Sequence, residues 1–87
     1  MPTIFIPAPL RELTGGLSHL DVPGKTFGEV LSELDRHYPG VKARLVRGDE
    51  LIPGFQVSVN DVLTKQGLRA KLEPTSEVHI LPVIAGG

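Results

Sequence analysis

The residues best suited to chemistry lie at the last positions of the 87-residue sequence, where Pro82-Val83-Ile84-Ala85-Gly86-Gly87 becomes steadily less bulky. Paired glycines at such a position pack nothing and lose much backbone entropy when they are ordered, so a stable fold gains little from them. They would let the backbone enter a narrow channel in another protein. We therefore expect Gly86 and Gly87 to be the working residues, on a flexible tail over 83–87 that follows a domain over 1–82.

The group that could react is the terminal carboxylate of Gly87. A carboxylate is a poor electrophile until it is activated. Adenylation would convert it into a mixed anhydride that a sulfur nucleophile can attack, and the product would be a terminal thiocarboxylate. The sequence contains no cysteine, so any sulfur that the chain carried would have to reside at this end. We expect no cofactor and no metal to be bound by the chain itself.

The other polar residues match no conventional site. Three histidines are far apart in the sequence and have no metal-ligand spacing, namely His19, His37 and His79. We expect them to be solvated or at the rim of the fold. Ser18 and Asp21 lie too close to His19 for a catalytic triad, which is assembled from distant segments. Gly15-Gly16 lacks the Lys-Ser/Thr of a phosphate loop and indicates a turn.

Length and charge narrow the function further. A chain of 87 residues is enough for one domain, with little room for an internal catalytic cavity. This favours a carrier over an enzyme. The net charge of -1 offers no excess of cations for nucleic-acid phosphates. There is no apolar run near the roughly 20 residues of a membrane span and no signal segment, so we expect no membrane partner and a cytoplasmic location.

Apolar periodicity predicts the elements that would position this end. Alternation predicts four strands, over 3–7, 18–22, 55–59 and 77–83. Thr26-Phe27-Gly28-Glu29 fits a capping box. One apolar helical stripe follows it, formed by Phe27, Val30, Leu31, Leu34 and Tyr38. Pro39-Gly40 would end this helix. The weaker segments predict another helical turn or two over 41–46, a polar loop over 47–54, a turn at 60–61, and a very short strand within 61–72.

The order of elements predicts an α+β domain in which a mixed sheet of four to five strands packs on one main helix. This is the β-grasp, or ubiquitin-like, arrangement. In the last strand Val78 and Ile80 would face inward and Leu81 outward. Leu81 would then join an apolar partner-binding surface formed with the residues that follow it, namely Pro82, Val83, Ile84 and Ala85. The open alternative is that the domain's own loop over 10–13 covers Leu81.

Several segments match the motifs of a known family: 10–16 (LRELTGG), 26–31 (TFGEVL), 57–60 (VSVN) and 78–87 (VHILPVIAGG). On these segments the chain resembles the MoaD/ThiS family of sulfur carriers over essentially its whole length. The resemblance implies that an E1-like adenylyltransferase uses ATP to adenylate Gly87. A sulfur donor protein then supplies the sulfur of the thiocarboxylate, and an acceptor enzyme receives it.

The resemblance leaves the acceptor open. Residues 6–16 and 59–61 look most like carriers that serve cysteine synthesis, with a cysteine synthase-like acceptor. The small subunit of molybdopterin synthase, acting with its large subunit, is nearly as good a fit. Asp61 stands where the family often has glycine, Leu63 stands at an often basic position, and Pro74 begins an unusual turn before the last strand. Two other functions also stay open: a ubiquitin-like modifier conjugated through Gly87 to lysines, and a non-reactive β-grasp interaction domain.

Overall fold

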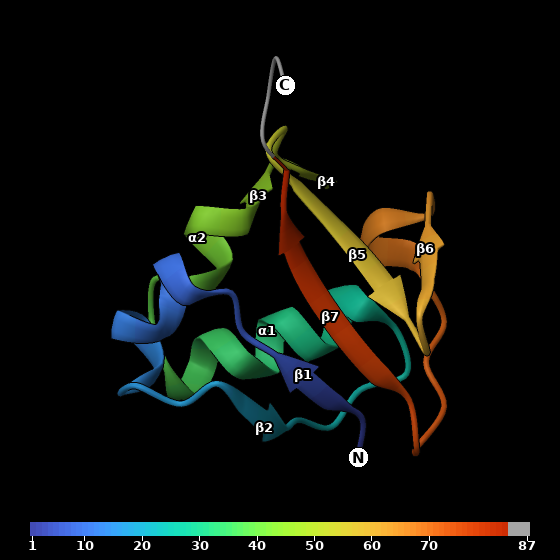
Figure 1. Cartoon of the computed structure of the whole chain (residues 1–87), viewed down its shortest axis with the longest axis horizontal. Coiled ribbons are helices and arrows are strands. Elements are labelled where there is room, and N and C mark those ends of the chain that lie inside the picture. The colour runs from blue at the N-terminus through green and yellow to red at the C-terminus, as the bar shows by residue number, and fades with distance from the viewer. Residues whose placement is uncertain (84–87) are drawn as a thin grey trace.

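A five-stranded mixed sheet forms the centre of the computed structural model, which describes residues 1–83 (Figure 1). Its strands, in the order β2-β1-β7-β5-β6, are β2 (His19–Asp21), β1 (Thr3–Phe5), β7 (Glu77–Pro82), β5 (Phe55–Val59) and β6 (Val62–Thr64). A separate hairpin consists of β3 (Val46–Arg47) and β4 (Glu50–Leu51). The helical elements are α1 (Phe27–His37), α2 (Val41–Leu45) and two 3-10 turns, η1 (Ala8–Thr14) and η2 (Gly67–Arg69).

The two central strands, β1 and β7, are parallel, and every other pair in the sheet is antiparallel. Thr3 lies opposite Glu77 and Phe5 opposite His79. β5 and β6 are joined by a tight turn in which Asn60 and Asp61 have φ angles of 51° and 69°. Two successive positive φ angles suit the twist of a two-residue hairpin. The predicted α+β fold of the β-grasp class, with four to five strands on one main helix, is confirmed.

The core lies between the sheet and α1, which crosses behind the sheet in Figure 1. Four residues of the predicted helical stripe are completely buried: Phe27, Val30, Leu31 and Leu34. The fifth, Tyr38, is partly buried at the end of the helix. From the sheet Ile4 and Val78 are fully buried, and Ile80 is 3% exposed. The residues predicted to face inward from the helix and from the strands therefore pack together in one core.

α1 begins as its sequence predicts, with one change of partner. The Thr26 hydroxyl accepts a hydrogen bond from the Glu29 backbone N–H at 3.2 Å. The Glu29 carboxylate accepts from the N–H of Lys25 at 3.1 Å, one residue before the donor of a standard capping box. Thr26 itself forms an antiparallel bridge with Lys71, which ties the start of the helix to the segment that precedes β7.

Two segments predicted as loops contain regular structure. The prediction of a polar loop over 47–54 is wrong in part, because Val46 pairs with Leu51 in the β3–β4 hairpin. Gly48, with a φ angle of 65°, allows the tight turn at the tip of this hairpin. The loop expected over 10–13 lies within the 3-10 helix η1. The first strand ends at Phe5, two residues before the predicted end, as Pro7 has no N–H with which to extend a ladder. Among residues 1–83 no helix is both long and apolar enough to span a membrane.

The helix cap gives a test of this part of the fold. Thr26→Ala removes the hydroxyl that accepts from Glu29 and should lower the free energy of unfolding by about 1 kcal/mol in urea denaturation. Thr26→Ser keeps the hydroxyl and is the matched control, so its stability should stay close to that of the parent protein. Equal losses in the two variants would show that the threonine methyl group, rather than the cap, provides the stabilisation.

Candidate functional site

β7 carries the chain toward the predicted reactive end. Val78 and Ile80 face the core as predicted. Leu81 is 38% exposed and Val83 is 41% exposed, and Pro82 is exposed as well. The other four predicted site residues lie outside the described residues, namely Ile84, Ala85, Gly86 and Gly87. The part of the site that the structure describes is therefore its base, which is apolar and open to solvent.

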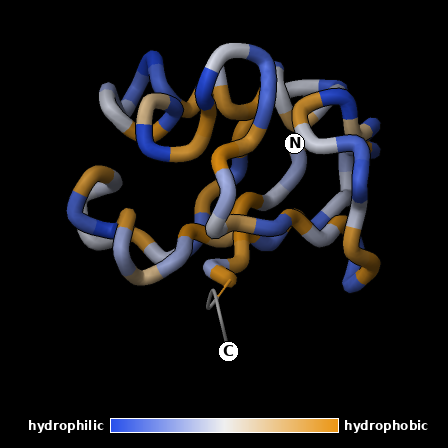
Figure 2. The backbone as a smooth tube through the Cα atoms, turned by 90° about the horizontal axis from the view of Figure 1, so that it is seen from above, coloured by the Kyte–Doolittle hydropathy of each residue, from blue (hydrophilic) through white to orange (hydrophobic). Residues whose placement is uncertain are grey.

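The end of β7 lies beside β5 and next to the β3–β4 hairpin (Figure 1). Leu81 is paired with Gln56, and Pro82 with Phe55. Beyond the strand, the Val83 backbone N–H donates to the carbonyl oxygen of Gly54 at 2.7 Å. Figure 2 shows that the chain is hydrophobic just before its grey end. The backbone is thus held to the sheet up to Val83.

Pro82 stands where its missing N–H costs nothing. Directly opposed residues of an antiparallel pair alternate between hydrogen-bonded and non-hydrogen-bonded positions. Because Val83 donates to Gly54, the neighbouring Pro82 takes a non-hydrogen-bonded position against β5. Its other side faces the edge of β7 that β1 leaves open after Phe5. A proline at this edge blocks the addition of another strand.

The outer face of the sheet carries a row of aromatic rings. The rings of Phe5 and His79 are stacked with centroids 4.1 Å apart and an interplanar angle of 2°. His19, on the other neighbour of β1, lies 5.5 Å from the Phe5 ring. Two of the three histidines that are distant in sequence therefore meet at one ring. Sequence periodicity gives the face on which each residue lies, but it does not give the register between strands, so this row was missed.

Leu81 follows His79 on the same outer face. The alternative in which residues 10–13 cover Leu81 does not hold, because Leu10 is only 2% exposed and packs in the core while Leu81 stays exposed. On the far side of β5, Leu63 is 57% exposed and lies opposite Ser58 in the register. The outer face of the sheet therefore exposes Leu81 and Leu63 beside the chain end, with the polar residues Gln56 and Ser58 on the strand between them.

The remaining polar candidates are engaged elsewhere. Asp21 accepts a hydrogen bond from the Thr3 hydroxyl at 2.6 Å, so its carboxylate is engaged by a residue other than His19. Ser18 contacts His19 at 3.2 Å, a pair that is local in sequence. No group of three His, Cys, Asp or Glu side chains within residues 1–83 has a metal-binding arrangement. The described part of the chain thus holds neither a triad built on His19 nor a metal centre.

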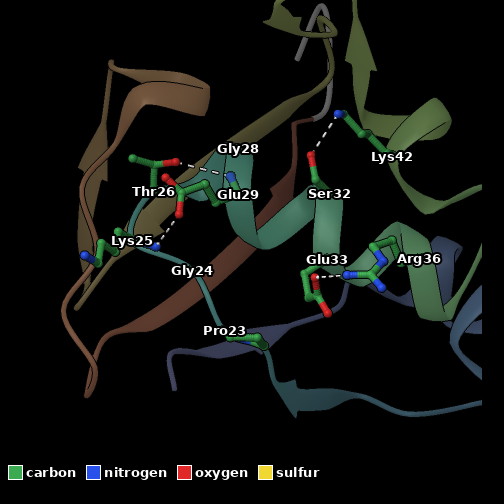
Figure 3. A pocket seen from close by; sticks show the side chains of 10 residues that line it. All are labelled: Pro23, Gly24, Lys25, Thr26, Gly28, Glu29, Ser32, Glu33, Arg36 and Lys42. Atoms are coloured by element: carbon green, nitrogen blue, oxygen red, sulfur yellow. Dashed lines mark hydrogen bonds and ion pairs between the residues drawn. The ribbon is translucent and has the colours of Figure 1, made fainter.

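A shallow hollow on the solvent side of α1 is also explained by local pairing (Figure 3). Lys42 donates to the Ser32 hydroxyl at 3.0 Å, and Arg36 pairs with Glu33 at 3.1 Å. Glu29 is engaged at the start of the helix. Exposed pairs of this kind contribute little to stability or to binding. The candidate functional site is therefore the outer sheet face with the end of β7.

The fold and this open strand end define the class of ubiquitin-like β-grasp proteins. Within that class the chain belongs to the ThiS family, whose family profile matches residues 4–87. The sulfur carrier protein CysO of Mycobacterium tuberculosis is 36% identical in an alignment of 92 positions, gaps included. The alignment covers 98% of this chain and 97% of that protein. Small archaeal modifier protein 3 of Haloferax volcanii is 33% identical over 64 residues, which cover 71% of this chain and 70% of that protein.

The same relationship is seen in three dimensions. A chain from the crystal structure of the Amycolatopsis orientalis BexX/CysO complex superposes on this one with a TM-score of 0.92 and 35% sequence identity. The superposition covers 100% of both chains. The fold of this chain is thus shared with a carrier of the CysO type over its full length.

Leu81 provides a test of the docking surface. Leu81→Glu should weaken binding to the E1-like adenylyltransferase and to the acceptor enzyme by more than about 1 kcal/mol, as measured by calorimetry, because it places a charge in an apolar contact. The free energy of unfolding should change by less than about 0.5 kcal/mol, since the side chain is exposed.

The matched control is Leu17→Glu, an equally apolar residue that is 43% exposed and precedes β2 at the other edge of the sheet. It adds the same charge at a distance from the end of β7 and should bind like the parent protein. Equal weakening by both variants, or unchanged binding of the Leu81 variant, would contradict this docking surface.

Proposed function

We propose that this chain is a sulfur carrier for cysteine synthesis, with the sulfur held on the carboxyl group of Gly87. The observation that carries the proposal is the continuity between the fold and the chain end. β7 leaves the core, exposes Leu81 and Val83, and continues directly into Gly86-Gly87 within the segment that matches the ThiS family. The protein acts as a co-substrate of other enzymes.

The proposed chemistry has two steps at the carboxyl group of Gly87, the first through its oxygen and the second at its carbonyl carbon. The Gly87 carboxylate oxygen attacks the α-phosphorus of ATP on the E1-like adenylyltransferase, and pyrophosphate leaves. A hydrosulfide ion supplied by the sulfur donor protein then attacks the carbonyl carbon of the acyl adenylate, AMP leaves with the bonding electron pair, and the S–H proton of the resulting thioacid goes to solvent. The product is a thiocarboxylate in which one carboxyl oxygen has been replaced by sulfur. Because side chains are absent at Gly86 and Gly87, both steps could take place in a narrow channel.

Three partners follow from this sequence of steps: the adenylyltransferase, a sulfur donor protein, and an acceptor enzyme. The similarity to the CysO carriers over nearly the full length of both chains supports a cysteine synthase-like acceptor over the large subunit of a molybdopterin synthase. We place the protein in the cytoplasm, where these partners would use ATP.

The second candidate function is protein modification, in which a lysine amine rather than a sulfur nucleophile attacks the acyl adenylate. It is supported by the similarity to an archaeal modifier protein, which covers a smaller part of the chain than the similarity to CysO. The intact mass of the protein isolated from its host distinguishes the two. Replacement of one oxygen by sulfur identifies the carrier, and conjugates of high mass identify the modifier.

The chain end is tested by removing Gly87 or by adding one residue after it. Either change moves the carboxylate away from the reacting centre, so ATP–pyrophosphate exchange by the E1-like adenylyltransferase should be lost. The free energy of unfolding should change by less than about 0.5 kcal/mol, the usual range for surface changes. Undiminished exchange with the shortened protein would overturn the assignment of Gly87.

The width of the channel is tested at the preceding residue. Gly86→Val places a branched side chain beside the reacting carbonyl and restricts the backbone, so thiocarboxylate formation should fall strongly while the melting temperature stays the same. Gly86→Ala adds only a methyl group and should lose less activity than the valine variant. Thiocarboxylate formation at the normal rate in Gly86→Val, followed by mass spectrometry, would show that no narrow channel is involved.

A further inference from the structure

We propose that the hydrogen bond from the Val83 backbone N–H to the Gly54 carbonyl oxygen is an anchor. It sets the starting point and the length of the reactive arm, by which we mean residues 84–87. Val83 and Gly54 would then be positioning residues for the activation of Gly87. This inference rests on the proposed function, because it concerns the delivery of the Gly87 carboxylate to the adenylating enzyme.

The bond is the backbone contact that the structure shows at Val83. The N···O distance of 2.7 Å is at the short end of the range for an N–H···O bond. The Val83 side chain is 41% exposed and so buries less of its surface than a core residue would. The preceding Pro82 has a ring that fixes its φ angle, which limits the directions in which the chain can leave the sheet.

The acceptor of this bond is supported from the core. Two residues before Gly54, the Ile52 N–H donates to the carbonyl oxygen of Leu45 at 2.9 Å, and Leu45 is completely buried. One residue after Gly54, Phe55 begins β5 and packs against the core. The Gly54 carbonyl is therefore held on both sides, by α2 and by the sheet. A bond to such a support can define a fixed starting point for the arm.

A glycine is favoured at position 54 because of the backbone conformation there. Its φ angle is 108°, which side chains of L-residues rarely allow, whereas a methyl group added there would meet no atom within 4 Å. The glycine thus serves to turn the chain and present its carbonyl oxygen to Val83, and it does not make space for a neighbour.

The anchor determines how far the reactive carboxylate can reach. Four residues, 84–87, follow Val83 and span at most about 14 Å when fully extended. Without this bond, the last hydrogen-bonded pair of β7 with β5 would be Leu81 with Gln56, because Pro82 lies at a non-hydrogen-bonded position. The arm would then be longer by two residues, or about 7 Å when extended. A displacement of even about 1 Å from the reacting geometry can cost on the order of 10²-fold in rate. A longer arm also lowers the effective concentration of the carboxylate.

The anchor is tested by Val83→Pro, which removes the N–H donor but keeps the length of the chain. We expect kcat for adenylation, measured by ATP–pyrophosphate exchange, to fall by at least about 10-fold. Val83 belongs to the predicted partner-binding surface, so Kd for the E1-like adenylyltransferase should change by a similar factor in Val83→Pro and in Val83→Ala. Val83→Ala is the matched control. It keeps the N–H and shortens the side chain, so the kcat of Val83→Pro should lie at least about 10-fold below that of Val83→Ala.

A second measurement is independent of activity. Amide hydrogen exchange in the free protein should be slow at Val83, as expected of a hydrogen-bonded amide. Gly54→Ala should speed exchange at Val83, because it strains the backbone that presents the acceptor. This variant also replaces Val83→Pro in the kinetic test if the proline variant melts at a lower temperature than the parent protein.

Three results would overturn the anchor: an unprotected Val83 amide, full activity of Val83→Pro, or an equal loss of activity in Val83→Ala. If the parent protein were not adenylated although its Val83 amide is protected, the proposed function would fail, and with it the role of the anchor. Adenylation of the parent together with full activity of the proline variant would remove the anchor alone. The failures of the two proposals are therefore distinguishable.

Discussion

The parallel pairing of β1 with β7 is the interaction on which the rest of the molecule depends. It joins the first strand of the chain to the last at the centre of the sheet, and the paired residues Ile4 and Val78 are both completely buried. Burying side chains of this size contributes about 1.5–3 kcal/mol each. The pairing stops at Phe5 because Pro7 cannot donate a hydrogen bond, while β7 continues to Pro82. The same contact therefore fixes β7 in the core, and beyond His79 only β5 and Gly54 hold the chain as far as Val83.

The alternation of β7 separates the stability of the fold from the surface that partners would contact. Its inward residues, Val78 and Ile80, belong to the core, and its outward residues, His79 and Leu81, form the aromatic row and the apolar end. Successive residues of a strand face opposite sides of the sheet, so the outward set can change with little effect on the inward set. A carrier that meets several partners benefits from this separation, because its surface can adapt while its core is retained.

Much of this fold can be predicted from the sequence, and the exceptions have a physical reason. The stripe that begins at Phe27 is long enough to identify a helix, and the alternation around Val57 and Ile80 is enough to orient two strands. The β3–β4 hairpin has strands of two residues each, which are too short to show a period. The stack of Phe5 on His79 and the bond from Val83 to Gly54 depend on the register between distant segments, and local periodicity carries no information on that register.

The candidate site was predictable in a different way. The residues at 86 and 87 were found from composition and order alone, because paired glycines at a chain end serve no packing purpose. They lie outside the described residues, so their role stays a prediction. The base of the site was predicted only in part: the exposure of Leu81 followed from strand alternation, while the position at which the chain leaves the sheet did not.

A carrier of this kind has to meet two opposed requirements. Its reactive end must be free of packing, since contacts with the domain would have to break each time a partner binds the end, and their free energy would oppose binding. The end must also start from a fixed point, because a loosely held carboxylate loses effective concentration at the reacting centre. The proposed anchor at Val83 meets both requirements, since a backbone hydrogen bond fixes the position of the chain while the Val83 side chain stays 41% exposed. The core behind Gly54 supplies the fixed support for this bond.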